Sequence, residues 1–110
     1  MQTYEVRVTE FAEEALREIG QYITYKLLNR DAAVNTLLAI REGIRQLSDH
    51  PQRIRLVEEE PWRTEGVRKQ RVKNFYVYFW IDEDHLRVQV THVVYVGRDQ
   101  KRQMETMPRE

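Results

Sequence analysis

The chain has 110 residues, of which 41% are apolar and 33% charged, which is sufficient for one hydrophobic core. Equal numbers of basic and acidic side chains, 18 of each, give a formal net charge of zero and argue against nonspecific nucleic-acid binding by the whole surface. The lack of cysteine excludes disulfides and thiol nucleophiles. No apolar run reaches the roughly 20 residues that span a bilayer. We expect a single cytoplasmic domain over residues 1–110, with no cofactor and no membrane partner.

Charge is unevenly distributed along the chain. Residues 1–62 hold 8 basic and 11 acidic side chains, whereas residues 63–110 hold 10 and 7. The basic excess therefore lies in the C-terminal part, and most of its cations are arginines, which suit planar contacts with carboxylates and phosphates. An arginine-rich surface that serves only solubility is the alternative.

The N-terminal half predicts a strand followed by two helices. Residues 4–8 alternate apolar and polar side chains, as a half-buried strand does. Thr9 is a candidate N-cap for a helix that begins at Glu10, and Asp31 is a candidate cap for a second helix that ends before Pro51. A break this short predicts an antiparallel helix hairpin. The first helix carries one apolar stripe: Ala12, Leu16, Ile19, Ile23 and Leu27.

A long connection over residues 49–65 comes next. Connections of this length are often functional or ordered by a partner. We expect Trp62 to close the edge of the core rather than to bind a ligand, and the acidic run Glu58–Glu60 to be solvated.

Three strands are predicted at about 66–73, 74–82 and 86–96, with a turn at Glu83–His85 and a frayed, polar tail from about residue 100. Helices segregated to one face of a mainly antiparallel sheet make an α+β, two-layer sandwich, here with the order β-α-α-β-β-β. The three-stranded part is expected to be an antiparallel meander.

Strand parity divides the large side chains of these strands between two faces. The helix-packed core should contain Phe75, Val77, Phe79, Ile81, Leu86, Val88, Val90, Val94 and Val96. The opposite, open face should carry Tyr76, Tyr78, Trp80, Arg87, Gln89, Thr91, Val93 and Tyr95. Because an uncovered aromatic face on a small domain usually awaits a partner, we predict a partner- or target-binding surface of Arg68, Arg71, Lys73, Tyr76, Tyr78, Trp80 and Arg87. The cations of the first meander strand are alternatively those of an edge strand that resists aggregation.

The three histidines do not predict a metal site. His92 is the natural candidate for a general base, but parity places it in the core unless a bulge re-aims it. His50 and His85 fall in turns that are far apart in the sequence. No spacing of histidine and carboxylate residues resembles a ligand set, so we expect no metal.

The order and spacing of four motifs carry a resemblance to a known family over about residues 4–102. The motifs are Gly66–Arg68, Val72–Phe75, Tyr78–Asp82 and Val93–Asp99. Together they resemble the RelE/ParE superfamily of toxins from bacterial type II toxin–antitoxin modules, which includes plasmid-stabilisation proteins. The resemblance implies a cytoplasmic toxin that a cognate antitoxin neutralises, and that reaches operator DNA only through the antitoxin.

One activity that the resemblance implies is ribosome-dependent, metal-independent cleavage of mRNA, as in RelE-like members. Such cleavage needs a base, a proton donor and cations. Those members carry an arginine where this chain has Tyr76, and a phenol supplies no fixed positive charge. In a nuclease, Tyr95 would be the acid or a stacking platform and Arg98 the phosphate clamp. Alternatively, Tyr95 packs against Tyr76 or Tyr78, and Arg98 pairs with a carboxylate such as Asp99.

The other implied activity is inhibition of DNA gyrase, as in ParE-like members. Arg68 and the pair Arg98–Asp99 match residues that these members keep. ParE-like members also often have an arginine at the position of Tyr76. This residue therefore argues against the nuclease more than it argues for gyrase inhibition. The sequence favours a ParE-like gyrase inhibitor; a ribosome-dependent endoribonuclease and a non-toxic relative that only binds its partner stay open. The zero net charge favours the gyrase inhibitor or the non-toxic relative.

Overall fold

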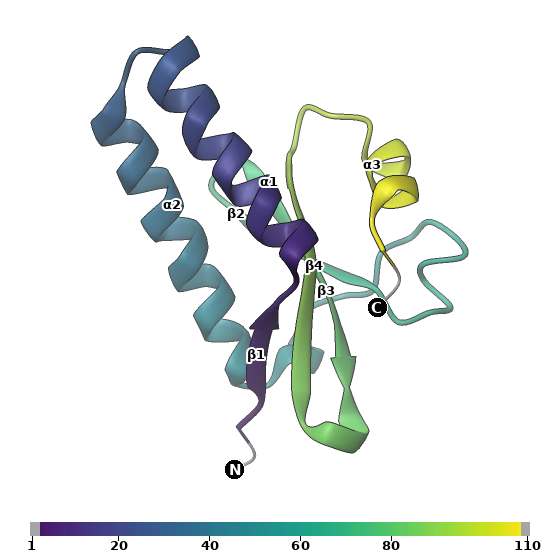
Figure 1. Ribbon diagram of the computed structural model, residues 1–110. Coiled ribbons are helices and arrows are strands. Elements are labelled where there is room, and N and C mark those ends of the chain that lie inside the picture. Colours follow the sequence, from purple (N-terminus) through teal and green to yellow (C-terminus); the bar gives the residue numbers. More distant parts are fainter. Residues whose placement is uncertain (1–2, 109–110) are drawn as a thin grey trace.

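The computed structural model describes residues 3–108. Two helices, α1 (Glu10–Gln21) and α2 (Arg30–Arg45), form an antiparallel hairpin on one face of a four-stranded sheet (Figure 1). The sheet has the order β1-β4-β3-β2, with β1 (Glu5–Val8) parallel to β4 (Arg87–Tyr95). Strands β2 (Arg68–Val72), β3 (Phe75–Asp82) and β4 form an antiparallel meander. The predicted α+β fold and its order of elements are confirmed.

Both helices of the hairpin begin at side-chain caps. In α1, the Thr9 hydroxyl accepts a hydrogen bond from the backbone N–H of Ala12 at 3.2 Å, as predicted. In α2, the Asn29 side chain accepts one from the N–H of Ala32 at 3.0 Å. The prediction of Asp31 as the cap is therefore wrong. Asp31 lies inside the first turn, where its charge interacts favourably with the helix dipole.

The apolar stripe of α1 does not continue to Leu27 as predicted. Helix α1 ends at Gln21, and a π-helical turn, Tyr22–Lys26, follows it. A π turn has more residues than an α turn, so the spacing that keeps the stripe on one face is lost. As a result Leu27 is 58% exposed, at the end of the hairpin.

The main core fills the space between the hairpin and the sheet. The first helix and α2 contribute buried side chains such as Leu16 and Ile40, and the strands contribute the predicted Val77, Phe79, Val88 and Val90. Residue Gly43 allows α2 to lie close to β2, because a Cβ atom there would be 2.5 Å from Cγ2 of Val72.

A β-bulge in β4 changes the parity that the sequence predicted. Tyr78 pairs with His92 and Phe79 with Val90, which leaves Thr91 without a partner on β3. Beyond the bulge, the faces are exchanged. Val93 therefore packs in the main core and Val94 on the opposite face, the reverse of the prediction.

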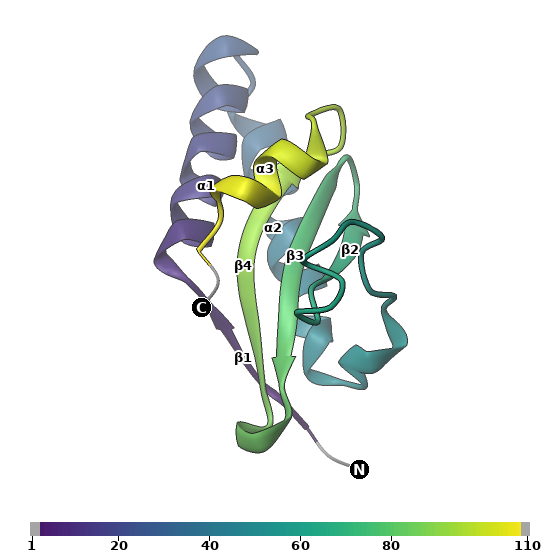
Figure 2. The ribbon, with the colours of Figure 1, turned by 90° about the vertical axis from the view of Figure 1, so that its right-hand side faces the viewer.

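The face of the sheet opposite α1 and α2, called the second face below, is also covered. Helix α3 (Gln100–Thr106) crosses it, and the connection of residues 49–67 lies beside it (Figure 2). The prediction of a frayed tail from residue 100 is wrong, because Met104 and Met107 anchor this segment in a second apolar cluster. Short helical turns complete the chain at Gln46–Ser48, Pro51–Arg53 and Glu83–His85.

Candidate functional site

The second face is an apolar cluster rather than an open aromatic surface. Its buried members are Val57, Trp62, Val67, Tyr78, Val94, Met104 and Met107. Tyr78 is 0% exposed, so the prediction that it faces a partner directly is wrong. The expectation that Trp62 closes the edge of a core is confirmed, since it is 4% exposed within this cluster. Sequence parity identified the face correctly but gave no sign of what covers it.

A hydrogen bond joins the second face to α3. The Tyr78 hydroxyl donates to Oε1 of Gln100 at 2.6 Å, and Nε2 of Gln100 donates to the carbonyl oxygens of Tyr95 at 3.0 Å and Arg98 at 2.8 Å. Burial, together with the negative charge of Glu59, raises the pKa of Tyr78. Tyr78 is therefore a neutral, structural phenol.

His92 lies on the second face because the bulge re-aims it. Its ring meets Phe11 edge to face at 4.8 Å, and Nε2 is 3.3 Å from Oε1 of Gln103 in α3. Nδ1 is buried and has no hydrogen-bond partner within residues 3–108. Burial lowers the pKa of His92, and Arg98 lowers it further, although the bond with Gln103 opposes this shift. A side chain 8% exposed is poorly placed to act as a base on a large substrate.

Three of the four predicted binding cations have contacts within the chain. Arg68 donates to the carbonyl oxygens of Ile54 and, at 3.3 Å, of Gln52, and so attaches the long connection to β2. Arg87 donates to the Glu5 carboxylate at 2.9 Å, across β4 and β1. Arg71 donates to the carbonyl oxygen of Lys73 at 2.9 Å in the β2–β3 turn. These contacts stabilise the sheet edges, and they leave Lys73 as an exposed cation of the turn.

Tyr76 and Trp80 are half-buried on the second face. The Lys69 ammonium group lies 4.3 Å from the centre of the Tyr76 ring, a cation–π contact. A cation is thus present near the position where RelE-like members have an arginine, but it belongs to β2. The sequence prediction did not include Lys69. Lys69 is two residues before Arg71 in the same strand, so the two side chains share a strand face, and this could have indicated Lys69 as a further binding cation.

The two predicted catalytic residues lie on either side of one turn, where the backbone N–H of Arg98 donates to the carbonyl oxygen of Tyr95 at 3.0 Å. Because of the bulge, Tyr95 packs edge to face on Phe75, with ring centres 5.9 Å apart, and not on Tyr76 or Tyr78. Tyr95 is 51% exposed. Arg98 is exposed in the loop before α3, and no described residue forms an ion pair with it. Asp99 caps α3 by accepting a hydrogen bond from the N–H of Arg102.

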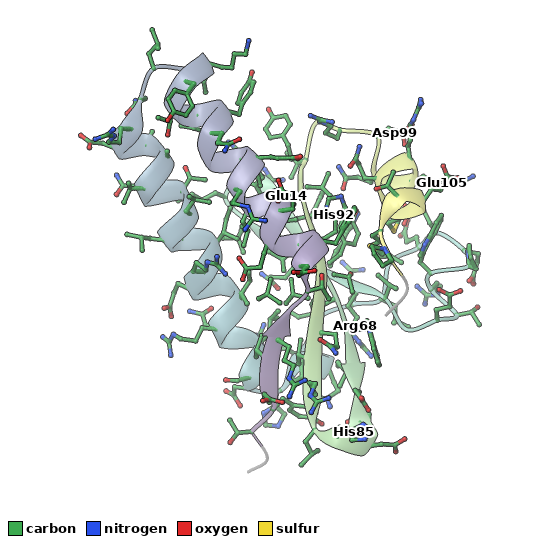
Figure 3. The ribbon with its side chains drawn as sticks, viewed as in Figure 1. Glu14, Arg68, His85, His92, Asp99 and Glu105 are labelled. Atoms are coloured by element: carbon green, nitrogen blue, oxygen red, sulfur yellow. The ribbon has the colours of Figure 1, made fainter. Side chains whose placement is uncertain are left out.

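The titratable groups are dispersed over the molecule. Figure 3 shows His85 at the β3–β4 turn, at the opposite end of the sheet from Asp99, with Arg68 and His92 between them. Within residues 3–108, no group of three or more histidine or acidic side chains could hold a metal ion. No helix in that range is long and apolar enough to cross a membrane.

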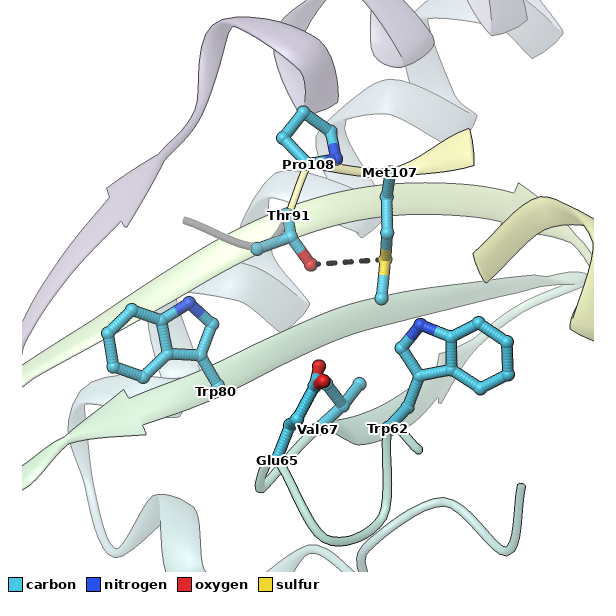
Figure 4. Close-up of a pocket in the computed structure, with 7 residues that line it drawn as sticks. All are labelled: Trp62, Glu65, Val67, Trp80, Thr91, Met107 and Pro108. Atoms are coloured by element: carbon cyan, nitrogen blue, oxygen red, sulfur yellow. Dashed lines mark hydrogen bonds between the residues drawn. The ribbon is translucent and has the colours of Figure 1, made fainter. Parts of the chain in front are cut away.

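A small cavity lies on the second face between the two tryptophans (Figure 4). Its volume is about 160 Å³, and its walls are Trp62, Glu65, Val67, Trp80, Thr91, Met107 and Pro108. The Thr91 hydroxyl, at the bulge, is 3.4 Å from the Met107 sulfur. The Trp80 indole N–H is buried and has no hydrogen-bond partner in the described part of the chain.

The end of the helix hairpin extends past the sheet (Figure 1), and exposed apolar side chains occur in this part of the chain. We call this surface the apolar hairpin end, and it consists of Tyr22, Tyr25, Leu27, Leu28, Val34 and Leu38. Leu28 is 85% exposed and has a left-handed backbone with φ of 52°. Contiguous apolar surface on a small protein typically marks an interaction site. The sequence prediction placed Leu27 in the apolar stripe of the first helix, whereas it is 58% exposed on this surface.

Solved structures define the class of protein to which this fold belongs. A chain of the chromosomal ParDE toxin–antitoxin system from P. aeruginosa superposes with a TM-score of 0.71 at 18% identity, over 86% of this chain and 98% of that one. A chain of the toxin–antitoxin complex RelBE2 from Mycobacterium tuberculosis gives 0.64 at 24% identity, over 86% and 93%. A mutant of the E. coli toxin RelE in the free state gives 0.63 at 12% identity, over 93% of each chain. The fold is that of the RelE/ParE toxins.

The family is defined by the sequence itself. Residues 6–100 match the family described as the ParE toxin of the type II toxin–antitoxin system parDE. The match covers most of the chain, and the chain therefore belongs to the ParE toxin family of type II toxin–antitoxin systems. A search of curated proteins found no match.

Proposed function

We propose that this ParE-family toxin inhibits DNA gyrase and that a cognate antitoxin neutralises it. The observation that carries the choice of gyrase over mRNA is that the candidate base is buried on the second face, whereas the candidate acid lies on the other face of the sheet. A nuclease gathers a base, a proton donor and cations around one phosphate. Here His92 is buried, Tyr95 lies on the hairpin side of the sheet, and Arg68 is bonded to the long connection.

The apolar hairpin end is the surface that best suits the antitoxin. Antitoxin segments that fold on binding bury apolar side chains along one helix or strand. The six exposed side chains of this surface provide such a contact without any rearrangement of the described core. Two of the similar solved structures are of toxin–antitoxin systems, which supports the same mode of control here.

The second candidate function is an endoribonuclease, and Lys69 is the observation that favours it. Its ammonium group lies over Tyr76, and the exposed Lys73 is nearby on the same hairpin. These cations can attract a phosphate, but His92, the candidate base of the second face, is only 8% exposed.

Two assays of the purified chain separate the candidates. With gyrase and relaxed plasmid, we expect loss of supercoiling and accumulation of linear DNA after detergent and protease treatment. With translating ribosomes, we expect intact mRNA by primer extension. Cleaved mRNA with normal supercoiling would overturn the proposal in favour of the nuclease. If the chain is inactive in both assays and does not arrest growth when induced alone, it is a non-toxic relative.

A further inference from the structure

Basic side chains gather at the end of the sheet where β2 turns into β3. Residues 69–76, around that turn, and residues 95–102, around the loop between β4 and α3, together hold six basic residues and one acidic residue, Asp99. The two segments are neighbours (Figure 2), because the backbone N–H of Val96 donates to the carbonyl oxygen of Asn74 at 2.9 Å. The local charge at this end is therefore positive, although the net charge of the chain is zero.

The cations of this surface are available to a ligand. We call the surface the basic end, and it consists of Arg71, Lys73, Arg98, Lys101 and Arg102. All five side chains are exposed, and none of them forms an ion pair within residues 3–108. The bond from Nε of Arg71 to the carbonyl oxygen of Lys73, at 2.9 Å, holds that guanidinium at the turn. The carboxylate of Asp99 accepts a bond from the backbone N–H of Arg102 as the cap of α3.

Protection of a sheet edge does not account for these cations. Strand β2 is at one edge of the sheet, and charges on an edge strand hinder pairing with other chains. However, Arg98 lies in a loop, and Lys101 and Arg102 lie in α3, where no strand edge needs protection. The opposite end of the sheet carries the acidic residues 82–84 instead. A surface charged only for solubility would not require this separation of signs.

We propose that the basic end binds the phosphate backbone of duplex DNA without reading its sequence. Duplex DNA carries one negative charge per about 1.7 Å of its axis, and lysine and arginine side chains contact its phosphates. Single-stranded RNA fits less well, because proteins that bind single strands stack the bases on exposed aromatic rings. Here Tyr78 is buried, the Lys69 ammonium group lies over the Tyr76 ring, and the half-exposed Tyr95 ring packs on Phe75.

The contact with DNA deepens the proposed function and rests on it for its role. Gyrase acts on duplex DNA, so a toxin that also contacts that DNA binds the complex of enzyme and DNA in preference to the enzyme alone. Because the contact reads no base, it is distinct from recognition of an operator through the antitoxin. Binding is measured with DNA alone, without gyrase, so that the two proposals can fail separately.

The probe is a fluorescein-labelled duplex of about 20 base pairs, titrated with the full chain and followed by anisotropy at several salt concentrations. If the basic end contacts about three to five phosphates, the logarithm of the affinity should fall with the logarithm of salt at a slope of about −2.7 to −4.5. A fourfold rise in salt then weakens binding about 40- to 500-fold. Lys73→Asn and Arg98→Gln should each reduce the slope by about one. Asparagine suits the left-handed backbone of Lys73, whose φ is 51°.

Arg55→Gln is the matched control. Arg55 is also an exposed cation, but it precedes Leu56, which pairs with Arg68 at the other end of β2. This variant should bind the duplex as the parent does. The proposal is overturned by the lack of salt-dependent binding, by an equal loss in Arg55→Gln, or by tighter binding of a single-stranded RNA of the same length. A chain that binds DNA but leaves gyrase active supports this inference and contradicts the proposed function, and a chain that inhibits gyrase without binding DNA does the reverse.

Discussion

At the level of single residues, the Tyr78 hydroxyl links the sheet to α3. We expect Tyr78→Phe to lower the free energy of unfolding by about 1 kcal/mol, the typical net contribution of one hydrogen bond. Gln100 would keep its bonds to backbone carbonyl oxygens, so the loss should not grow further. Urea denaturation measures the change. Tyr25→Phe is the control, since Tyr25 is 72% exposed and should give no change.

His92 gives a second prediction at this scale, on pH. Because the pKa of His92 is lowered in the folded protein, the unfolded chain binds more protons below about pH 6.5. The stability associated with neutral His92 is therefore complete above that pH and decreases as the pH falls through it. Carboxyl groups with a lowered pKa, such as Glu13 beside Arg41, change the stability in a more acidic range, below about pH 4.5.

Urea midpoints measured between pH 7.5 and 5.5 test this expectation, because the lower end of this interval is about one pH unit above the carboxylate range. The parent should lose stability across this interval. His92→Gln should show a flatter dependence, since glutamine does not titrate in this range. A Leu86→Asn variant, changed at the β3–β4 turn, removes no titrating group; it is the control and should follow the parent. Parallel curves for the parent and His92→Gln would contradict the assignment.

At the level of elements, α3 is attached to the sheet mainly by two methionines. Met104 is 1% exposed, and truncation of a buried methionine to alanine typically costs about 2–5 kcal/mol. We expect Met104→Ala to lower stability within that range and to increase amide hydrogen exchange in α3 and at Tyr78 more than in α1. Met107→Ala tests the other anchor. Exchange that rises equally throughout the chain would contradict a local attachment.

The elements that the sequence predicted are those with long, regular patterns. The strands and the two helices follow from period, caps and breaks, as at Thr9 and Pro51. The parity of β4 was lost at Thr91, because a bulge depends on packing and not on a local motif. Helix α3 is too short for its period to stand out, and its two buried methionines gain meaning only once Tyr78 and Val94 form the surface beneath them. The candidate site was therefore located on the correct face but assigned the wrong exposure.

At the level of the whole molecule, both faces of the sheet are covered within the described chain, by the hairpin on one side and by α3 with the long connection on the other (Figure 2). The large apolar surface that stays exposed lies at one end of the hairpin. A partner that stabilises this protein would therefore bury that end in preference to the meander. This changes where the antitoxin is expected, from the strands that dominate the sequence pattern to the turn between two helices.

Two leucines offer a matched test of that expectation. Leu28 is at the apolar hairpin end, and Leu86 is at the β3–β4 turn; both are exposed, at 85% and 37%, and both have left-handed backbones, with φ of 52° and 48°. Asparagine adopts this conformation readily, so either replacement should preserve the fold. Burying one leucine contributes about 1.5–3 kcal/mol, and about 1.4 kcal/mol corresponds to a factor of ten in affinity. Leu28→Asn should therefore weaken binding of the antitoxin encoded beside the toxin by tenfold or more. Leu86→Asn should leave this affinity unchanged, and calorimetric titration measures both affinities. If both variants bind as the parent does, the antitoxin does not cover Leu28, and the gyrase proposal is unaffected; if Leu86→Asn alone binds weakly, the antitoxin lies along the meander instead.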